Sequence, residues 1–345
     1  MDEKLANPKS MKKMILRSIR TTLLEGGSST KAELSDKLGI SFPTVSKFLA
    51  DMEKDGEIIS LGLDESSGGR RAKRYTYNPE YMLGLAIFLE KSETNYTIFN
   101  CFGEIKKQGK VSSVLKEDGL HLLTTHIEEI ITANPKIRSM AIGVPGAVDR
   151  GRIFHIPGYE QFKDLDLKGY YENYFSIPVA VENDMNAAVL GYYHTRKRKD
   201  QSLVYLYSGQ NGPGAGIMIN GTVVRGSMFF SGEVQFVPQY NERNFQEALM
   251  NGSGTRNETI SEKYEIDAIG RLVASFVAII NPHTFIFCQD EVNEATMDKI
   301  KENSSTYIPA EHLPAFQVGD WKQDYLFGLQ NLCLEVMVDK ISNLS

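Results

Sequence analysis

Apolar segments of strand length alternate with helical segments from residue 82 to the C-terminus. Strand-like runs lie at 82–89, 95–99, 139–144, 178–181, 203–207 and 284–288. A hairpin turning at Asn220-Gly221 is expected over 217–224. Apolar residues at helical spacing occupy 119–133, 185–193, 266–280 and 324–344. This alternation predicts an α/β fold in which mostly parallel sheets are covered by helices.

Length and composition limit the class of protein. The 345 residues suffice for two or three domains, and the contents of 41% hydrophobic and 24% charged residues are those of soluble globular proteins. No run approaches the roughly 18 apolar residues of a membrane-spanning helix, and no signal peptide is recognised. The 3 cysteines have no ligand or redox spacing, so we expect no disulfide framework. A cytoplasmic protein without a membrane partner is predicted.

Charge is distributed unevenly along the chain. The formal net charge is −6, yet residues 1–80 carry a small excess of lysine and arginine over acids. The negative charge is therefore concentrated in residues 81–345. This asymmetry favours different partners for the two parts of the chain.

The N-terminal residues predict three short helices. Apolar residues of 11–24 have helical spacing, and Thr30 with Glu33 forms a capping box that starts a second helix. Ser41 is expected to cap a third helix, with Pro43 in its first turn. The second and third of these predicted helices, joined by a short turn, form the helix-turn-helix pattern. The small polar and basic residues near the start of the third helix are expected to meet bases and phosphates in a major groove: Ser41, Thr44, Ser46 and Lys47.

A basic hairpin is predicted directly after the three helices. Strands at 58–61 and 71–77 flank a turn rich in serine and glycine at 64–69. The second half of the hairpin gathers four cations that suit phosphates or a narrow minor groove, namely Arg70, Arg71, Lys73 and Arg74. A helix pair alone is usually ordinary core, and a basic run is usually a solvated face. Their order here favours a winged helix-turn-helix domain over residues 1–78, joined at Asn78-Pro79 to a second domain, 79–345.

Polar residues in the second domain lie where ligands bind in open α/β sheets. Asn183 and Asp184 follow a predicted strand and open a predicted helix, so they are candidates for holding hydroxyl groups, and Asp184 for acting as a general base. The alternative is that Asp184 is only the N-cap of that helix. The glycine-rich stretch 209–216 is a weak phosphate-cradle signal, and Glu233 offers a third polar contact.

The order of these motifs resembles the ROK family, which joins sugar-responsive transcriptional repressors to sugar kinases of the actin-like ATPase, ribonuclease H-like fold. The resemblance rests on AIGVPGAVD at 141–149, PVAVENDMNAAVLGYY at 178–193 and NGPGAGIMINGTVVRG at 211–226. SSGGRRAKRYTYNPEY at 66–81 is similar to the wing and linker of the repressor branch. The resemblance implies a two-lobed second domain with a sugar site at Gly146, Asn183, Asp184 and Glu233.

Two departures from the family pattern bear on activity. Kinases of the family have an Asp-x-Gly-Gly-Thr phosphate loop, whose place is taken here by Ala86, Phe88, Leu89 and Glu90. Bulky side chains and a carboxylate disfavour phosphate, so we expect no ATP binding and no enzyme activity, although Asp184 aligns with the catalytic base.

The second departure concerns zinc. The family usually has the motif Gly-Glu-x-Gly-His, whose histidine binds a structural zinc, followed by a cluster of cysteines. Here Gln235 and Phe236 stand in place of the Gly-His pair, and residues 237–264 contain no cysteine or histidine. We expect no zinc and no cofactor. Phe236 is expected either to stack on a sugar ring or to fill the space that zinc would take.

The resulting hypothesis is a DNA-binding regulator, a repressor of carbohydrate-utilisation genes, controlled by a sugar or sugar phosphate. Its expected partners are operator DNA, this effector, and further copies of the chain in a homodimer or homotetramer. The helix 324–344 is a candidate for packing against 11–24 and transmitting the signal. Two alternatives remain: a regulator with a vestigial cleft controlled by a protein partner, and a sugar kinase.

Overall fold

The computed structural model describes residues 8–63, 72–156, 158–196, 201–209, 212–250, 254–255 and 259–344. The predicted turn at 64–69 and the predicted DNA contacts Arg70 and Arg71 lie outside these ranges.

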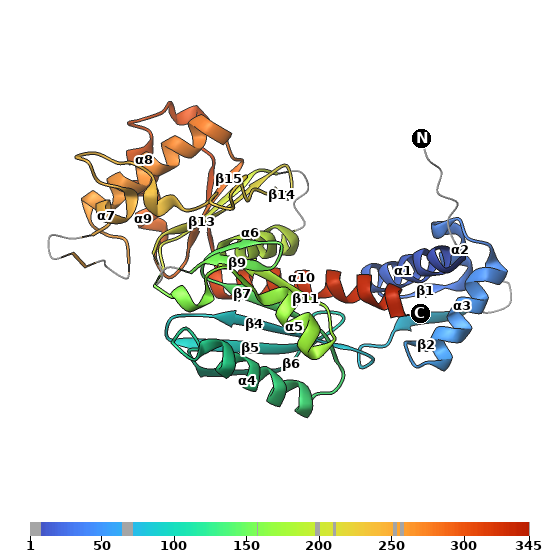
Figure 1. The fold of residues 1–345 in the computed structure, drawn as a ribbon. Helices are drawn as coiled ribbons and strands as arrows, with labels where there is room; N and C mark the ends of the chain where they lie inside the picture. Colours follow the sequence, from blue (N-terminus) through green and yellow to red (C-terminus); the bar gives the residue numbers. More distant parts are fainter. Residues whose placement is uncertain are drawn as a thin grey trace, which may run out of the picture.

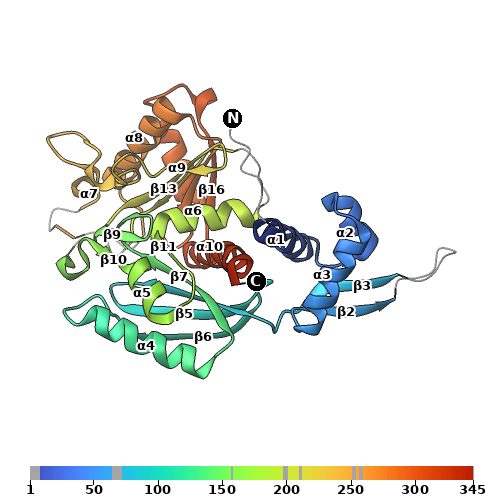
Figure 2. The same cartoon turned by 45° about the vertical axis from the view of Figure 1, so that its right-hand side comes forward.

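The N-terminal part consists of helices and a small antiparallel sheet. The elements are α1 (Pro8–Gly26), β1 (Ser29–Thr30), α2 (Lys31–Leu38), α3 (Phe42–Lys54), β2 (Ile58–Leu63) and β3 (Lys73–Tyr77). The sheet has the order β1-β3-β2. Figure 2 shows the hairpin of β2 and β3 projecting away from the rest of the molecule. The predicted helices and hairpin are thus present in the predicted order.

Local signals fix the start of α2 but act differently at α3. Thr30 accepts a hydrogen bond from the Glu33 N–H at 3.2 Å, and the Thr30 N–H donates to the Glu33 carboxylate at 2.8 Å. This confirms the capping box. Ser41 occupies the N-cap position of α3, but its side chain makes no capping bond. Its hydroxyl instead lies 2.8 Å from the Thr44 hydroxyl. The expected side-chain cap is therefore wrong, because the Ser41 hydroxyl pairs with this side chain rather than with a backbone N–H of α3.

A buried polar network ties the N-terminal helices to the hairpin. Arg20 of α1 lies 2.5 Å from Glu57, and both side chains are 4% exposed. The Tyr77 hydroxyl, at the end of β3, donates to the same carboxylate at 2.9 Å. Around this network the apolar faces of α1, α2 and α3 form one core. The hairpin is therefore held to the helices by packing and by a shared buried carboxylate.

The first lobe of the larger part is a five-stranded sheet with the order β11-β7-β4-β5-β6. Its strands are β4 (Leu83–Leu89), β5 (Glu93–Asn100), β6 (Ile105–Ser112), β7 (Ile137–Val144) and β11 (Val179–Asn183). Helices α4 (Gly119–Ala133) and α5 (Leu167–Phe175) pack on one face. A small sheet of β8 (Ala147–Asp149), β9 (Arg152–His155) and β10 (Leu165–Asp166) follows β7, with a 3-10 turn at Glu160–Phe162.

The second lobe repeats this arrangement with the order β14-β13-β12-β15-β16. Its strands are β12 (Leu203–Tyr207), β13 (Gly214–Ile219), β14 (Thr222–Val223), β15 (Thr284–Cys288) and β16 (Ala315–Gly319). Its helices are α7 (Phe245–Ala248), α8 (Lys263–Ile280) and α9 (Glu294–Ser304), with 3-10 turns η2 (Val234–Phe236) and η3 (Ala310–His312).

Helices α6 (Asp184–Thr195) and α10 (Trp321–Leu344) lie between the two sheets (Figure 1). Their buried side chains share one core with residues of β4 and β7 below and β12, β13 and β15 above. The two helices approach so closely that a Cβ added at Gly328 would lie 1.9 Å from the Ala187 carbonyl oxygen. Only glycine fits there, so α6 and α10 form a single central layer.

The predicted mostly parallel sheets are not found. In each lobe two neighbouring strand pairs are parallel and two are antiparallel, for example β4 with β7 and β4 with β5. The antiparallel pairs arise because β4, β5 and β6, like β12, β13 and β14, are joined by turns rather than by helices. Strand β6 was not expected because its residues are mostly exposed and polar.

Helix α10 also reaches the N-terminal part. It contacts α1, and Met337 near its C-terminal end is 2% exposed within the core formed by α1, α2 and α3. The predicted packing of 324–344 against 11–24 is therefore confirmed, while its role in signalling stays a prediction. No helix in the described ranges has the length and apolar character needed to cross a membrane.

Candidate functional site

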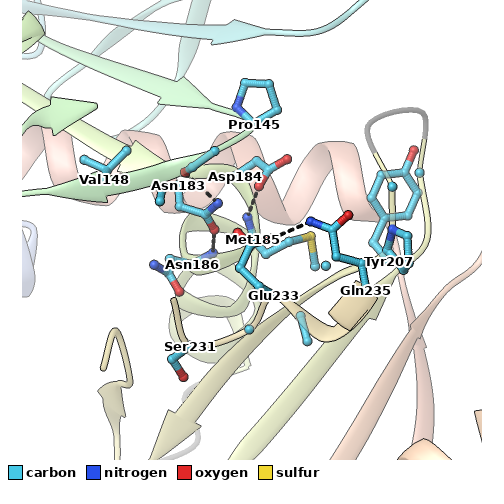
Figure 3. Close-up of a pocket in the computed structure, with 18 of the residues that line it drawn as sticks. Pro145, Val148, Asn183, Asp184, Met185, Asn186, Tyr207, Ser231, Glu233 and Gln235 are labelled. Carbon is cyan, nitrogen blue, oxygen red and sulfur yellow. Dashed lines mark hydrogen bonds between the residues drawn. The ribbon is translucent and has the colours of Figure 1, made fainter. Parts of the chain in front are cut away.

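A cleft between the two lobes collects the four residues predicted for a sugar site. Gly146, Asn183, Asp184 and Glu233 all line it, together with residues of β4, β12 and β13. Figure 3 shows Asn183 and Asp184 at the start of α6, facing Glu233 and Gln235 from the second lobe. The grouping predicted from separate sequence segments is thus present in three dimensions.

Asn183 connects two elements of the first lobe. Its side-chain oxygen accepts from the Asn186 N–H at 3.0 Å and its amide donates to the Gly146 carbonyl at 3.0 Å. Parallel pairing places Asn183 opposite Val144, which brings the Pro145-Gly146 turn beside it. Asn183 therefore caps α6, and the alternative that Asp184 is the N-cap is wrong because Asp184 is already the first helical residue.

Asp184 has an unusual electrostatic environment. One carboxylate oxygen accepts the Met185 N–H at 2.8 Å. Burial in the cleft raises the pKa of Asp184 to about 7, the nearby Glu233 carboxylate also raises this pKa, and the Met185 N–H lowers it. A carboxyl group that is partly protonated near neutrality can both donate to and accept from a hydroxyl group.

Glu233 approaches from the second lobe. Its carboxylate accepts a hydrogen bond from the Gln235 amide at 2.8 Å. The loop 224–232 that leads to it is tied to the first lobe through Arg225, which lies 2.5 Å from Glu182 at the end of β11. Because Glu182 also bonds the Asn186 amide at 3.1 Å, the loop and the start of α6 are positioned together.

The expected phosphate-loop position is filled by side chains. Ala86, Phe88 and Leu89 are buried in the sheet. Glu90, at the end of β4, accepts from the Asn95 amide at 2.9 Å, and burial raises its pKa. Nearby, Trp321 stacks on Tyr207 with ring centroids 4.3 Å apart, and both line the cleft. A carboxylate and two aromatic rings are poor ligands for a triphosphate.

The segment that replaces the expected zinc region is held by apolar packing. Phe245, Ala248 and Leu249 are buried in the core of the second lobe. Phe236 is 54% exposed and stacks on the exposed Phe230 with centroids 5.4 Å apart. Both expectations for Phe236 are therefore wrong, because it turns outward to Phe230 and does not line the cleft. The described residues contain no group of three or more potential metal ligands.

The predicted nucleic-acid contacts lie on an exposed part of α3. Ser41 and Lys47 are exposed, and Thr44 and Ser46 are partly exposed. The other side of α3 is buried through Val45, Leu49 and Met52. The structure thus leaves the four residues accessible at one end of the helix and uses the opposite face for the core.

The basic hairpin is partly neutralised by acids from the helices. Lys73 lies 2.6 Å from Glu53 of α3. Arg74 donates to both carboxylate oxygens of Glu33, at 2.8 and 3.0 Å. The sequence run contains no acid, but the fold brings two beside it. Lys73 and Arg74 are thus already engaged by carboxylates in this structure, and their contact with DNA stays a prediction.

Other cleft residues were missed by sequence reasoning. Arg225, Phe229 and Tyr207 line the cleft beside the predicted residues. Arg225 belongs to the quoted segment 211–226 but was not singled out, while Phe229 and Tyr207 come from a loop and a strand end without a recognisable motif. For Phe229, the proximity of the loop to Glu233 along the chain was the available signal.

These features define a class: a two-lobed α/β domain with a polar cleft, preceded by a small helical part. Residues 86–244 match the model of the ROK family. Residues 86–244 therefore form a ROK family domain, in agreement with the predicted resemblance.

Curated relatives include repressors and kinases. The xylose repressor of Bacillus subtilis (strain 168) is 25% identical over 236 residues, which cover 67% of this chain and 62% of the relative. A putative xylose repressor of Caldicellulosiruptor sp. (strain Rt8B.4) is 32% identical over 225 residues, which cover 63% of this chain and 56% of the relative. The beta-glucoside kinase of Listeria innocua is 30% identical over 152 residues, which cover 44% of this chain and 50% of the relative. The chain thus spans about 60% of the length of the repressors it matches.

Solved structures share the fold. A ROK family transcriptional regulator, a homolog of the E. coli MLC protein, superposes with a TM-score of 0.71 at 19% identity, over 97% of this chain and 98% of the other. A ROK family glucokinase from Streptomyces griseus, in complex with glucose and AMPPNP, has a TM-score of 0.57 at 19% identity, over 73% of this chain and 99% of the glucokinase. The actin-like ROK fold predicted for the second domain is therefore present.

Proposed function

We propose that this chain is a DNA-binding transcriptional repressor of carbohydrate-utilisation genes whose operator affinity is set by a sugar in the cleft. The observation that carries the proposal is a physical connection. One helix, α10, begins at the cleft with Trp321, and Met337 near its other end lies in the core of the N-terminal part. A ligand that changes the cleft is therefore linked by a single element to the part that presents α3.

The N-terminal part acts in this proposal as a winged helix-turn-helix domain, residues 1–78. Helix α3 enters the major groove with Ser41, Thr44, Ser46 and Lys47, while the hairpin residues Arg70, Arg71, Lys73 and Arg74 contact the backbone or the minor groove. Two copies in a homodimer or homotetramer present paired helices to a pseudo-palindromic operator. The cytoplasmic location stays a prediction within this proposal.

The cleft acts as the effector site. Asn183, Asp184 and Glu233 supply donors and acceptors from both lobes, so a sugar that bonds all three favours one arrangement of the lobes. Control of DNA binding requires that the two arrangements differ in operator affinity. The xylose repressors among the relatives support a pentose as the first effector to test.

The experiment is fluorescence anisotropy on DNA from upstream of the chain's own gene at fixed salt, repeated with free and phosphorylated sugars. Tight binding released by one sugar is expected, and Asp184→Ala should abolish that release without changing the affinity for DNA. Tight binding that no sugar changes would indicate a vestigial cleft and control by a protein partner. Absence of binding to that DNA and to genomic fragments would contradict the proposal.

One observation favours a second candidate, a sugar kinase. Asp184 stands at the start of α6 with a pKa raised to about 7, as suits a general base toward a hydroxyl. Glu90 and the Tyr207–Trp321 stack argue against bound triphosphate. An ADP-release assay with ATP and a panel of sugars separates the kinase from the repressor. The repressor proposal expects that the wild-type protein releases ADP no faster than Asp184→Ala.

A further inference from the structure

Phe229 is an unexpected residue in the wall of the cleft. It belongs to the loop 224–232 of the second lobe and lines the cleft beside Ser231 and Glu233. Its backbone φ is 55°, in the left-handed region that a phenylalanine rarely adopts. Non-glycine residues held there cost of the order of 1–3 kcal/mol and cluster at ligand sites. The conformation therefore needs a reason.

The ring of Phe229 is backed by an aromatic ring from the other lobe. It stacks on Phe154 of β9, with centroids 5.8 Å apart and planes inclined by 13°. Phe154 is 37% exposed and is not among the described residues that line the cleft. Phe154 thus supports Phe229, and the pair bridges the lobes.

The loop around Phe229 is fixed at both ends. Arg225 pairs with Glu182 of the first lobe at 2.5 Å. At the other end the Ala215 N–H of β13 donates to the Gly232 carbonyl at 2.8 Å. These contacts anchor the two ends of the loop that carries Phe229.

We propose that Phe229 is a specificity-determining residue: an aromatic wall against which a pyranose ring packs its C–H face while Asn183, Asp184 and Glu233 bind its hydroxyl groups. The inference rests on the sugar-responsive function proposed above and deepens it. A pyranose carries its hydroxyls at the rim and C–H groups on its faces, so packing one face on a phenyl ring removes apolar surface of both from water. Because Phe154 belongs to the first lobe, the wall is complete only when the lobes are arranged as here, and a bound sugar favours that arrangement.

The variant Phe229→Gly separates ligand binding from folding. Glycine adopts a φ of 55° without strain, and this relief offsets part of the cost of losing the stack on Phe154 and of the greater entropy of the unfolded chain, so the melting temperature without sugar is expected to change by only a few degrees. The affinity for the sugar is expected to fall about tenfold, because the wall is lost. Isothermal titration calorimetry with D-xylose and D-glucose, and thermal unfolding with and without each sugar, measure the two effects.

Phe230→Ala is the matched control. Phe230 is the next residue, is 56% exposed and stacks on Phe236 outside the cleft, so its loss should leave sugar affinity unchanged. Phe154→Ala should weaken sugar binding less than Phe229→Gly, since it removes only the support.

The outcomes separate this inference from the proposed function. If wild type binds a pyranose and Phe229→Gly binds it equally well, the wall is refuted while the sugar-responsive function stands. Tighter binding by Phe229→Gly would show that the ring obstructs the cleft and would equally overturn the inference. If wild type binds neither sugar nor any other pyranose of the panel, both proposals fail.

Discussion

Asp184 shows, at the scale of a single residue, how burial changes the chemistry of a common side chain. Its ordinary pKa is 3.8, and in the cleft burial raises it to about 7, with the Glu233 charge adding to the effect. The Met185 N–H opposes this shift without cancelling it. The residue therefore holds a proton in the folded chain over a range of pH where the unfolded chain has lost it.

This shift predicts the pH dependence of stability. Between about pH 4 and about pH 7 the folded state binds more protons at Asp184 than the unfolded state, so its contribution to the free energy of unfolding falls as the pH rises and levels off above 7. Asp184→Asn lacks the titrating group. Urea unfolding of both proteins across this window should show wild type losing stability relative to the variant. Parallel curves would contradict the raised pKa.

At the scale of elements, the ion pairs between the hairpin and the helices predict the effect of removing one acid. Glu33→Gln keeps an oxygen that can accept the Thr30 N–H, so the capping box of α2 is preserved. The variant removes the carboxylate that engages Arg74 and one negative charge beside the expected DNA surface. DNA affinity at low salt should therefore rise several-fold. Anisotropy titrations measure it; unchanged binding would place Glu33 away from DNA, and weaker binding would show that the carboxylate positions Arg74 for DNA.

The hairpin also predicts a salt effect. Arg71→Ala should weaken DNA binding to all sequences and reduce the slope of log affinity against log salt by about 1, as expected for one lost phosphate contact. Lys107→Ala is the control, because Lys107 is an exposed cation on β6, in the first lobe. Equal effects of the two variants would indicate a general charge effect and remove the support for the wing.

At the scale of the whole molecule, α10 is the element that reaches both the cleft and the N-terminal core. Its close packing on α6 at Gly328 and the burial of Met337 in the N-terminal core leave little room for independent movement of the two parts. Close-packed interiors respond to displacement by switching between arrangements. This architecture supports a mechanical link between the cleft and α3.

The link predicts an uncoupled variant. Met337→Ala removes the contact of α10 in the N-terminal core, at a cost of about 2–5 kcal/mol in stability. Sugar binding should persist, while a higher sugar concentration should be needed to release DNA. Met337→Leu, which keeps the volume, should restore coupling, and Met297→Ala on α9 controls for loss of a methionine in the second lobe. Release at an unchanged sugar concentration in Met337→Ala would rule out this route.

The sequence by itself determined the local structure and the list of candidate residues. The capping box at Thr30, the alternation of strands and helices, and the polar residues where β11 meets α6 follow from short-range rules, because caps, turns and periodic burial depend on neighbouring residues. The family resemblance supplied the grouping of Gly146, Asn183, Asp184 and Glu233, which the cleft confirms.

Only the tertiary structure decided which residues meet. Glu33 and Glu53 neutralise Arg74 and Lys73 from separate helices, and Phe154 supports Phe229 from another lobe. The raised pKa of Asp184 likewise depends on burial and on a carboxylate 49 positions away along the chain. Such contacts join segments with no shared sequence signal, because their energies depend on distance in space and on exclusion of water.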